Sequence, residues 1–158
     1  MANKISNINV ENAKIIFKNF SGRATPISPK GVRGFSLVLT QEDAERFIND
    51  GWNVRYLNPR EEGDEPTPIL DVRVRIDEDT PLPAEVYLVQ NGFKHRLYED
   101  TIHMLDEMTF DNIDLVIRPR YWEMNGKSGI KAYLKTLYAS GITDTITSKY
   151  LDIPLAED

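Results

Sequence analysis

The sequence contains no cysteine in its 158 residues. Disulfide bonds and thiolate metal sites are therefore excluded, which fits a reducing cytoplasm. No apolar run approaches the roughly 18 residues that a membrane-spanning helix needs. Residues 1–14, MANKISNINVENAK, also lack the apolar segment of a signal peptide. We therefore expect a cytoplasmic protein with no membrane partner.

Signatures of catalysis are scarce as well. There are only two histidines, His95 and His103, no Ser/His/Asp arrangement and no glycine-rich phosphate loop. The acidic segments EEGDE (61–65) and DEDT (77–80) carry carboxylates of the kind that bind Mg²⁺ or Ca²⁺. Proline-flanked acidic loops are more often solvated turns. We expect no enzyme and no cofactor, with a metal-dependent enzyme as one alternative.

The net charge of -6 is unevenly distributed along the chain. Residues 1–40 carry +5, residues 41–113 carry -11, residues 114–138 carry +3 and residues 139–158 carry -3. The negative net charge of the whole chain argues against a surface that binds nucleic acid everywhere. A net charge is an average, however, and does not exclude a local basic face.

Apolar and polar residues alternate in about seven short stretches, the period of half-buried strands. Two short helices are expected, one at 41–50 between the N-cap residue Thr40 and Gly51, the other within 99–108. The Asn-Gly pairs at 91–92 and 125–126 predict tight hairpin turns. The sequence thus predicts a mainly β chain, with one domain over residues 1–150 that forms a small barrel or sandwich.

The second hairpin, residues 115–137, segregates its side chains by face. Antiparallel pairing around Asn125-Gly126 places Ile117 opposite Leu134 on an apolar face, together with the pairs Leu115/Thr136, Pro119/Ala132 and Tyr121/Ile130. The other face then holds the pairs Arg118/Tyr133, Arg120/Lys131, Val116/Lys135 and Trp122/Gly129. All the strongly basic side chains of the two strands therefore share one face with two aromatic residues.

Cations that face each other across a sheet destabilise it, and a polyanion would remove that penalty. Single-stranded nucleic acid suits such a face, because its phosphates meet cations while its bases stack on aromatic rings, at roughly 1–3 kcal/mol per base. The alternative is a solvated strand face on which Tyr133 and Trp122 cover a neighbouring loop.

Three segments resemble phage single-stranded DNA-binding proteins of the OB fold: NFSGRATPISPKGVRGFSLVL (19–39), WEMNGKSGIKAYLKTLYA (122–139) and YLDIPLAED (150–158). The resemblance as a whole extends over about half of the chain, at both of its ends. The resemblance implies an OB-fold-like β-barrel and binding of single-stranded DNA, without catalysis, during phage DNA replication or recombination in the infected bacterial host. It also implies a short, flexible acidic C-terminal tail over residues 151–158 that recruits replication or recombination proteins. This tail lacks the terminal aromatic residue of the family pattern, which puts that recruitment in question.

The resemblance and the hairpin pattern together predict the residues that contact DNA. They are Arg118, Arg120, Trp122, Lys131, Tyr133 and Lys135 from the hairpin and, on spacing alone, Lys14, Lys18 and Phe20 from the first strand. The competing interpretation is a protein-binding or inhibitor β-domain of viral origin. It would be either an assembly factor or an inhibitor whose acidic segment 41–113 mimics nucleic acid. Salt distinguishes the two, since DNA binding through lysines weakens steeply as salt rises. The sequence leaves open whether the chain forms a homodimer.

Overall fold

The structure is a computed structural model that describes residues 6–26, 30–59, 61–77, 79–90 and 92–142, together with Ile153 and Ala156. The acidic tail expected over residues 151–158 lies outside the described residues, apart from these last two, which are exposed. Asn91, the first residue of one predicted turn, also lies outside them. Within the described part, no helix combines the length and the apolar character needed to cross a membrane.

The described residues form nine strands, one α-helix and one 3₁₀ helix, so the prediction of a mainly β chain is confirmed. In chain order these are β1 (Ile8–Val10), β2 (Ile15–Asn19), β3 (Arg33–Val38), α1 (Gln41–Asp50), β4 (Val54–Leu57), β5 (Thr67–Val74), β6 (Glu85–Gln90), β7 (Phe93–Leu97), η1 (Ile102–Asp106), β8 (Thr109–Met124) and β9 (Lys127–Ile142).

The helix α1 has the predicted ends. The Thr40 side chain accepts a hydrogen bond from the Asp43 amide, and Gly51 ends the helix at a φ of 101°. The second predicted helix is shorter and of the 3₁₀ type, η1, with Ile102 and Leu105 fully buried.

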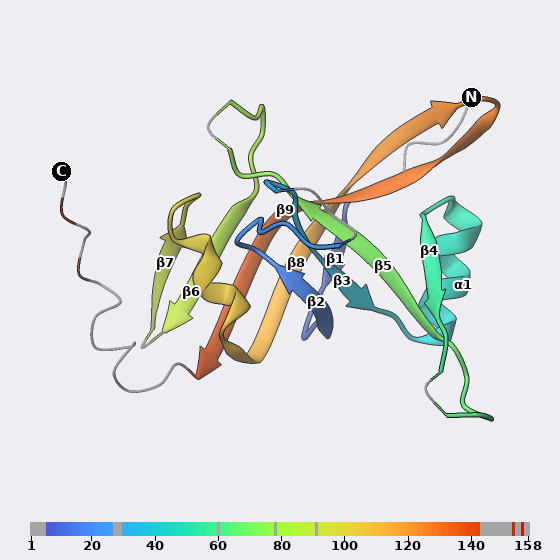
Figure 1. Ribbon diagram of the computed structural model, residues 1–158, viewed down its shortest axis with the longest axis horizontal. Coiled ribbons are helices and arrows are strands. Elements are labelled where there is room, and N and C mark those ends of the chain that lie inside the picture. Colours follow the sequence, from blue (N-terminus) through green and yellow to red (C-terminus); the bar gives the residue numbers. More distant parts are fainter. Residues whose placement is uncertain are drawn as a thin grey trace.

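The strands follow the order β1-β8-β9-β5-β3-β2, with β4 beside β5 and the β6–β7 hairpin beside β9 (Figure 1). Because β1 and β2 are consecutive in the chain, they act as one interrupted strand that pairs with β8 on one side and β3 on the other. The Ala13 amide, between them, donates to the Ile113 carbonyl of β8 at 2.7 Å. Of the other pairs in this circuit, β3–β5 and β8–β9 are antiparallel, and β5–β9 is parallel. This is the partly open, OB-like barrel that the resemblance implied.

One side of each barrel strand supplies the core. Phe35 and Leu37 of β3, Val72 of β5, Ile117 of β8 and Leu134 of β9 are all buried. The polar residues that alternate with them face outward, as the period of two requires. The barrel therefore holds the outer faces of β3, β5, β8 and β9 on a rigid base.

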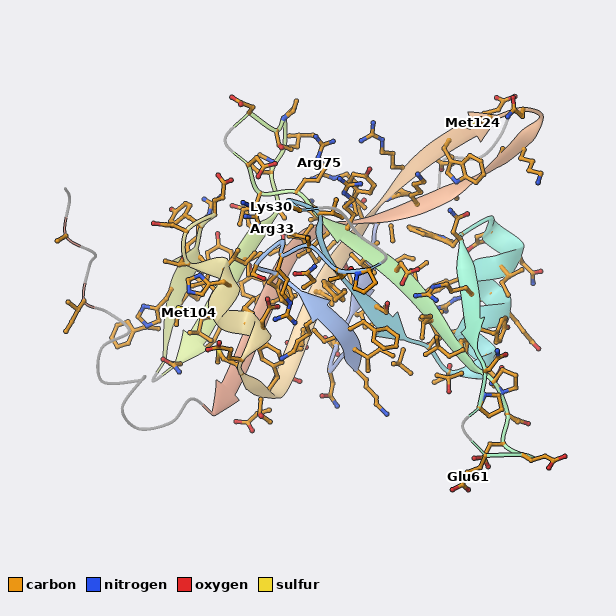
Figure 2. All side chains as sticks on the ribbon, in the orientation of Figure 1. Lys30, Arg33, Glu61, Arg75, Met104 and Met124 are labelled. Carbon is orange, nitrogen blue, oxygen red and sulfur yellow. The ribbon has the colours of Figure 1, made fainter. Side chains whose placement is uncertain are left out.

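The β8–β9 hairpin turns where predicted. Asn125 and Gly126 have φ values of 52° and 78°, both in the left-handed region that a two-residue turn of this kind needs. The outer half of the hairpin projects beyond the rest of the sheet (Figure 1), and Figure 2 shows Met124 at its tip. From the turn to the pair Ile117/Leu134, the predicted register is confirmed.

Beyond that pair, the predicted register is wrong. A β-bulge at Lys135 makes Thr136 the partner of Val116, and Leu137 the partner of Leu115. Without the extra residue, Thr136 would face Leu115 in the core and the following Leu137 would point outward. The bulge instead lets Leu137 pack in the core, where its side chain is 1% exposed.

Candidate nucleic-acid interface

The outer face of the barrel is hollowed along β3 and β5. Side chains from β2, β3, β4, β5 and β9 border this hollow, here called the groove, whose volume is about 610 Å³. Its charged lining residues are four cations and one carboxylate: Arg33, Arg55, Arg73, Lys131 and Asp71. In an OB fold, the second and third barrel strands, here β3 and β5, form the face that binds oligonucleotides. The groove is thus a positively charged channel at that location.

A smaller hollow of about 150 Å³, here called the side pocket, lies next to the groove. Arg75, Arg118, Arg120 and the loop residues Thr80–Leu82 border it, and so does Tyr133, which also borders the groove. Figure 2 shows Arg33, of the groove, and Arg75, of the side pocket, in the central part of the molecule. Tyr133 is the residue at which the two hollows meet.

The strand register surrounds Tyr133 with arginines. Tyr133 pairs with Arg73 of β5 on one side and with Arg118 of β8 on the other. The guanidinium of Arg120 lies over the Tyr133 ring, 5.2 Å from its centroid. A half-buried aromatic ring in a frame of cations offers a stacking surface next to groups that attract phosphate.

At the groove floor beside Arg73, a glycine lets β3 and β5 approach each other closely. Gly34 of β3 pairs with Arg73, and a Cβ placed on Gly34 would lie only 2.6 Å from the Val72 carbonyl oxygen. A larger residue would push the strands apart, so the position requires glycine.

Several cations of the two hollows have no ionic partner. Among the described residues, no carboxylate oxygen lies within 4.0 Å of a side-chain nitrogen of Arg73, Arg75, Arg120 or Lys131. Within the same part of the chain, Arg118 donates one hydrogen bond, a long one of 3.5 Å to the Leu82 carbonyl. Uncompensated positive charge on one face attracts an anionic ligand.

The other two arginines are held in place. Arg33 donates through Nε to the Phe20 carbonyl at 2.9 Å and through Nη1 to Asp77 at 3.2 Å. Arg55 donates through Nε to Asp71 at 2.6 Å, and Ser36 donates to the same carboxylate at 2.6 Å. Burial alone would raise the pKa of Asp71, but the hydrogen bonds from Arg55 and Ser36 outweigh it and lower that pKa. Asp71 therefore stays ionised at neutral pH and keeps Arg55 oriented.

Four of the nine predicted site residues border the two hollows. Lys131 and Tyr133 line the groove, and Arg118 and Arg120 line the side pocket. Trp122 lies farther out on the hairpin, half-buried against Gly129. Lys14 and Lys135 are exposed but line neither hollow.

The structure corrects the predicted positions of Phe20 and Lys18. Phe20 is fully buried, with its ring centroid 5.6 Å from that of Phe35, so it cannot lie on an exposed basic face. Lys18 donates to the carbonyls of Leu105 and Met108 at 3.0 and 2.7 Å, and burial lowers its pKa although Asp106 acts in the opposite sense. The simple alternation assumed for this strand fails because β2 contains a bulge between Ile16 and Asn19.

Sequence reasoning missed most of the groove: Phe17, Arg33, Arg55 and Arg73, as well as Arg75 of the side pocket. One signal was available, because Arg73 and Arg75 alternate with the buried Val72 and Val74 and must therefore share the outer face of β5.

For the acidic segments, the described residues contain no group of three or more histidine, aspartate or glutamate side chains placed to hold a metal ion.

Solved structures with a similar fold include the single-stranded DNA-binding protein of bacteriophage Enc34. Its complex with single-stranded DNA matches at 12% identity and a TM-score of 0.55, covering 87% of this chain and 88% of that chain. Another structure of the Enc34 protein matches at 15% identity and a TM-score of 0.52, covering 92% and 90%. The single-stranded DNA-binding protein gp2.5 of bacteriophage T7 scores 0.42 at 9% identity, covering 97% and 99%, too low a score to support an argument.

No curated protein sequence matches the chain. The model of one protein family does, and its match extends over residues 1–158; the family is described as "Putative phage ssDNA-binding domain". The chain belongs to this phage single-stranded DNA-binding family.

Proposed function

We propose that the chain binds single-stranded DNA along the groove and past Tyr133 into the side pocket, without catalysis and without sequence preference. Bases stack on Tyr133, while phosphates meet Arg73, Lys131 and Arg120, the cations beside it for which the described residues offer no ionic partner. The protein acts in phage DNA replication or recombination, in the cytoplasm of the infected host.

The observation that carries this proposal is the position of Tyr133. It borders both hollows, and arginines lie on either side of it in the sheet. Phosphate contacts and base stacking are the two interactions that sequence-independent binding of a single strand requires. Membership of the family supports the same ligand, and so does the similar fold of the Enc34 protein, which was solved in complex with single-stranded DNA.

The test is titration of a fluorescently labelled oligothymidylate at several salt concentrations. Replacing Tyr133 with Ala should weaken binding roughly tenfold or more, with little change in the salt slope, because stacking carries no charge. Replacing it with Phe should preserve affinity. Replacing Lys131 with Ala should weaken binding and reduce the slope of log K against log salt by about 0.7, the value for one phosphate contact of a single strand.

Lys135 provides a matched control on the same strand, since it is exposed but lines neither hollow. Lys135→Ala should change both affinity and salt slope less than Lys131→Ala. Equal effects of the two variants would point to diffuse attraction by the whole surface and against the groove. A binding constant that does not respond to salt would contradict the proposal and favour the protein-binding alternative.

A further inference from the structure

Phe17 has a backbone conformation that its own side chain disfavours. Its φ is 55°, a region where the Cβ of an L-residue crowds the following carbonyl oxygen, and a bulky residue there is a clear outlier. The cause is the bulge in β2. Ile16 pairs with Ser36 and Asn19 with Gly34, so β2 holds one residue more than β3 between these two pairs.

The same bulge exposes an apolar ring and turns a charged side chain inward. The Phe17 side chain is 62% exposed, whereas its neighbour Lys18 is half-buried and bonded to the carbonyls of Leu105 and Met108. Burial favours a phenyl ring and opposes an ammonium group. The arrangement therefore stabilises the fold less than the reverse one would. Strained residues of this kind cluster at functional sites.

Phe17 also lies on the groove, at the wall opposite Tyr133. The strands β2, β3, β5 and β9 are consecutive neighbours in the sheet, so three inter-strand steps of about 4.8 Å separate the two aromatic residues, about 14 Å in all. One strand of DNA advances about 3.4 Å per stacked nucleotide, so about four nucleotides would bridge this distance. Between the two rings lie Gly34, which adds no side chain of its own, and Arg73, which supplies charge.

We propose that Phe17 is a second base-stacking platform and that the DNA strand crosses β3 and β5 between Phe17 and Tyr133. The inference rests on the proposed function and adds to it the direction of the bound strand and its minimum length. The strained backbone at Phe17 keeps the ring in the groove instead of in the core.

The experiment compares Phe17→Tyr, Phe17→Ala and Phe17→Gly in the full chain, with a thymidine trinucleotide and a thymidine decanucleotide. The Tyr variant should bind the decanucleotide as the wild type does. The Ala and Gly variants should both bind it roughly tenfold or more weakly, since each lacks the ring. For the trinucleotide, too short to reach both platforms, the loss should not exceed about twofold, because Tyr133 alone can stack its bases.

Melting temperatures distinguish the effect of backbone strain at Phe17 from the effect of losing its aromatic ring. Phe17→Gly should melt at a higher temperature than Phe17→Ala, because glycine adopts a positive φ without steric cost. This reverses the usual ranking of the two residues within a strand. If Gly is the less stable of the two, the backbone there is not strained and the argument from strain fails.

If Phe17→Ala binds the decanucleotide as tightly as the wild type does, the inference is overturned, but the proposed function is not. An equal loss of affinity for both oligonucleotides would also overturn it, because the strand would then not span two platforms. If the wild type binds neither oligonucleotide, the proposed function fails first and the inference falls with it.

Discussion

Arg55 of β4 and Asp71 of β5 form a two-pronged ion pair in the groove, with Nε to Oδ2 at 2.6 Å and Nη2 to Oδ1 at 3.2 Å. The pair places one carboxylate among the groove cations that would contact phosphate. This carboxylate would repel the backbone of a bound strand, and it also occupies an arginine that could contact that backbone.

Replacing Asp71 with Asn should therefore tighten DNA binding. Removing one partly exposed charge is worth about 0.5–1 kcal/mol at low salt, or about two- to fivefold in affinity, and less as salt screens it. Titration at two salt concentrations measures the change, and Glu61→Gln, in an exposed loop, is the control. Weaker binding by Asp71→Asn would show instead that the orientation of Arg55 by Asp71 favours DNA binding more than the carboxylate opposes it.

The stability of the fold should depend on the ionisation of Asp71. Its pKa is lower in the folded chain than the value of about 3.9 for an unfolded aspartate, so its contribution is complete above that value and is lost as the pH falls through the folded pKa. Melting temperatures of wild type and Asp71→Asn should thus differ at neutral pH and converge in acid. A gap that stays constant down to about pH 2 would contradict this assignment.

Lys18 should matter for stability and not for DNA. Lys18→Ala leaves the carbonyls of Leu105 and Met108 without their donor, at a cost of about 1–3 kcal/mol. Chemical denaturation should detect this loss, while the salt slope of DNA binding stays unchanged. Lys131→Ala, on the exposed rim of the groove, should show the opposite combination. A reduced salt slope for Lys18→Ala would show that Lys18 contacts DNA after all.

We propose that residues 151–158 form an acidic tail that competes with DNA for the cations of the groove. Deleting them removes Asp152, Glu157 and Asp158. The melting temperature should not change, whereas affinity for DNA should rise at low salt and approach the wild-type value as salt increases. The full-length triple variant Asp152→Asn, Glu157→Gln, Asp158→Asn should reproduce the effect. Unchanged or weaker binding after deletion would assign the segment another role.

Local chemistry made part of the fold predictable from sequence. The turn at Asn125-Gly126 and the ends of α1 at Thr40 and Gly51 depend on residues within a few positions of each other, and all are where the pattern placed them. The pairing of Arg118 with Tyr133 and of Arg120 with Lys131 followed directly from that turn.

Long-range pairing made the rest unpredictable. The bulges at Lys135 and in β2 depend on what the partner strand requires, and so the outward position of Phe17 has no signal in its own neighbourhood. The groove arises where β9 pairs with β5 in parallel. This pairing places Tyr133 beside Arg73, although the two residues are far apart in the sequence. The hairpin part of the site was therefore predicted, while the part on β2, β3, β4 and β5 was missed.

The place of β9 in the sheet has a consequence for how the chain folds during synthesis. β9 is the hydrogen-bonded neighbour of β5, β6 and β8, yet it leaves the ribosome after all three. At about 5–20 residues per second, the earlier strands wait for seconds with an incomplete barrel and apolar surface exposed. A nascent chain that stops before residue 127 should thus stay protease-sensitive, and release of β9 should trigger closure of the barrel in one late step.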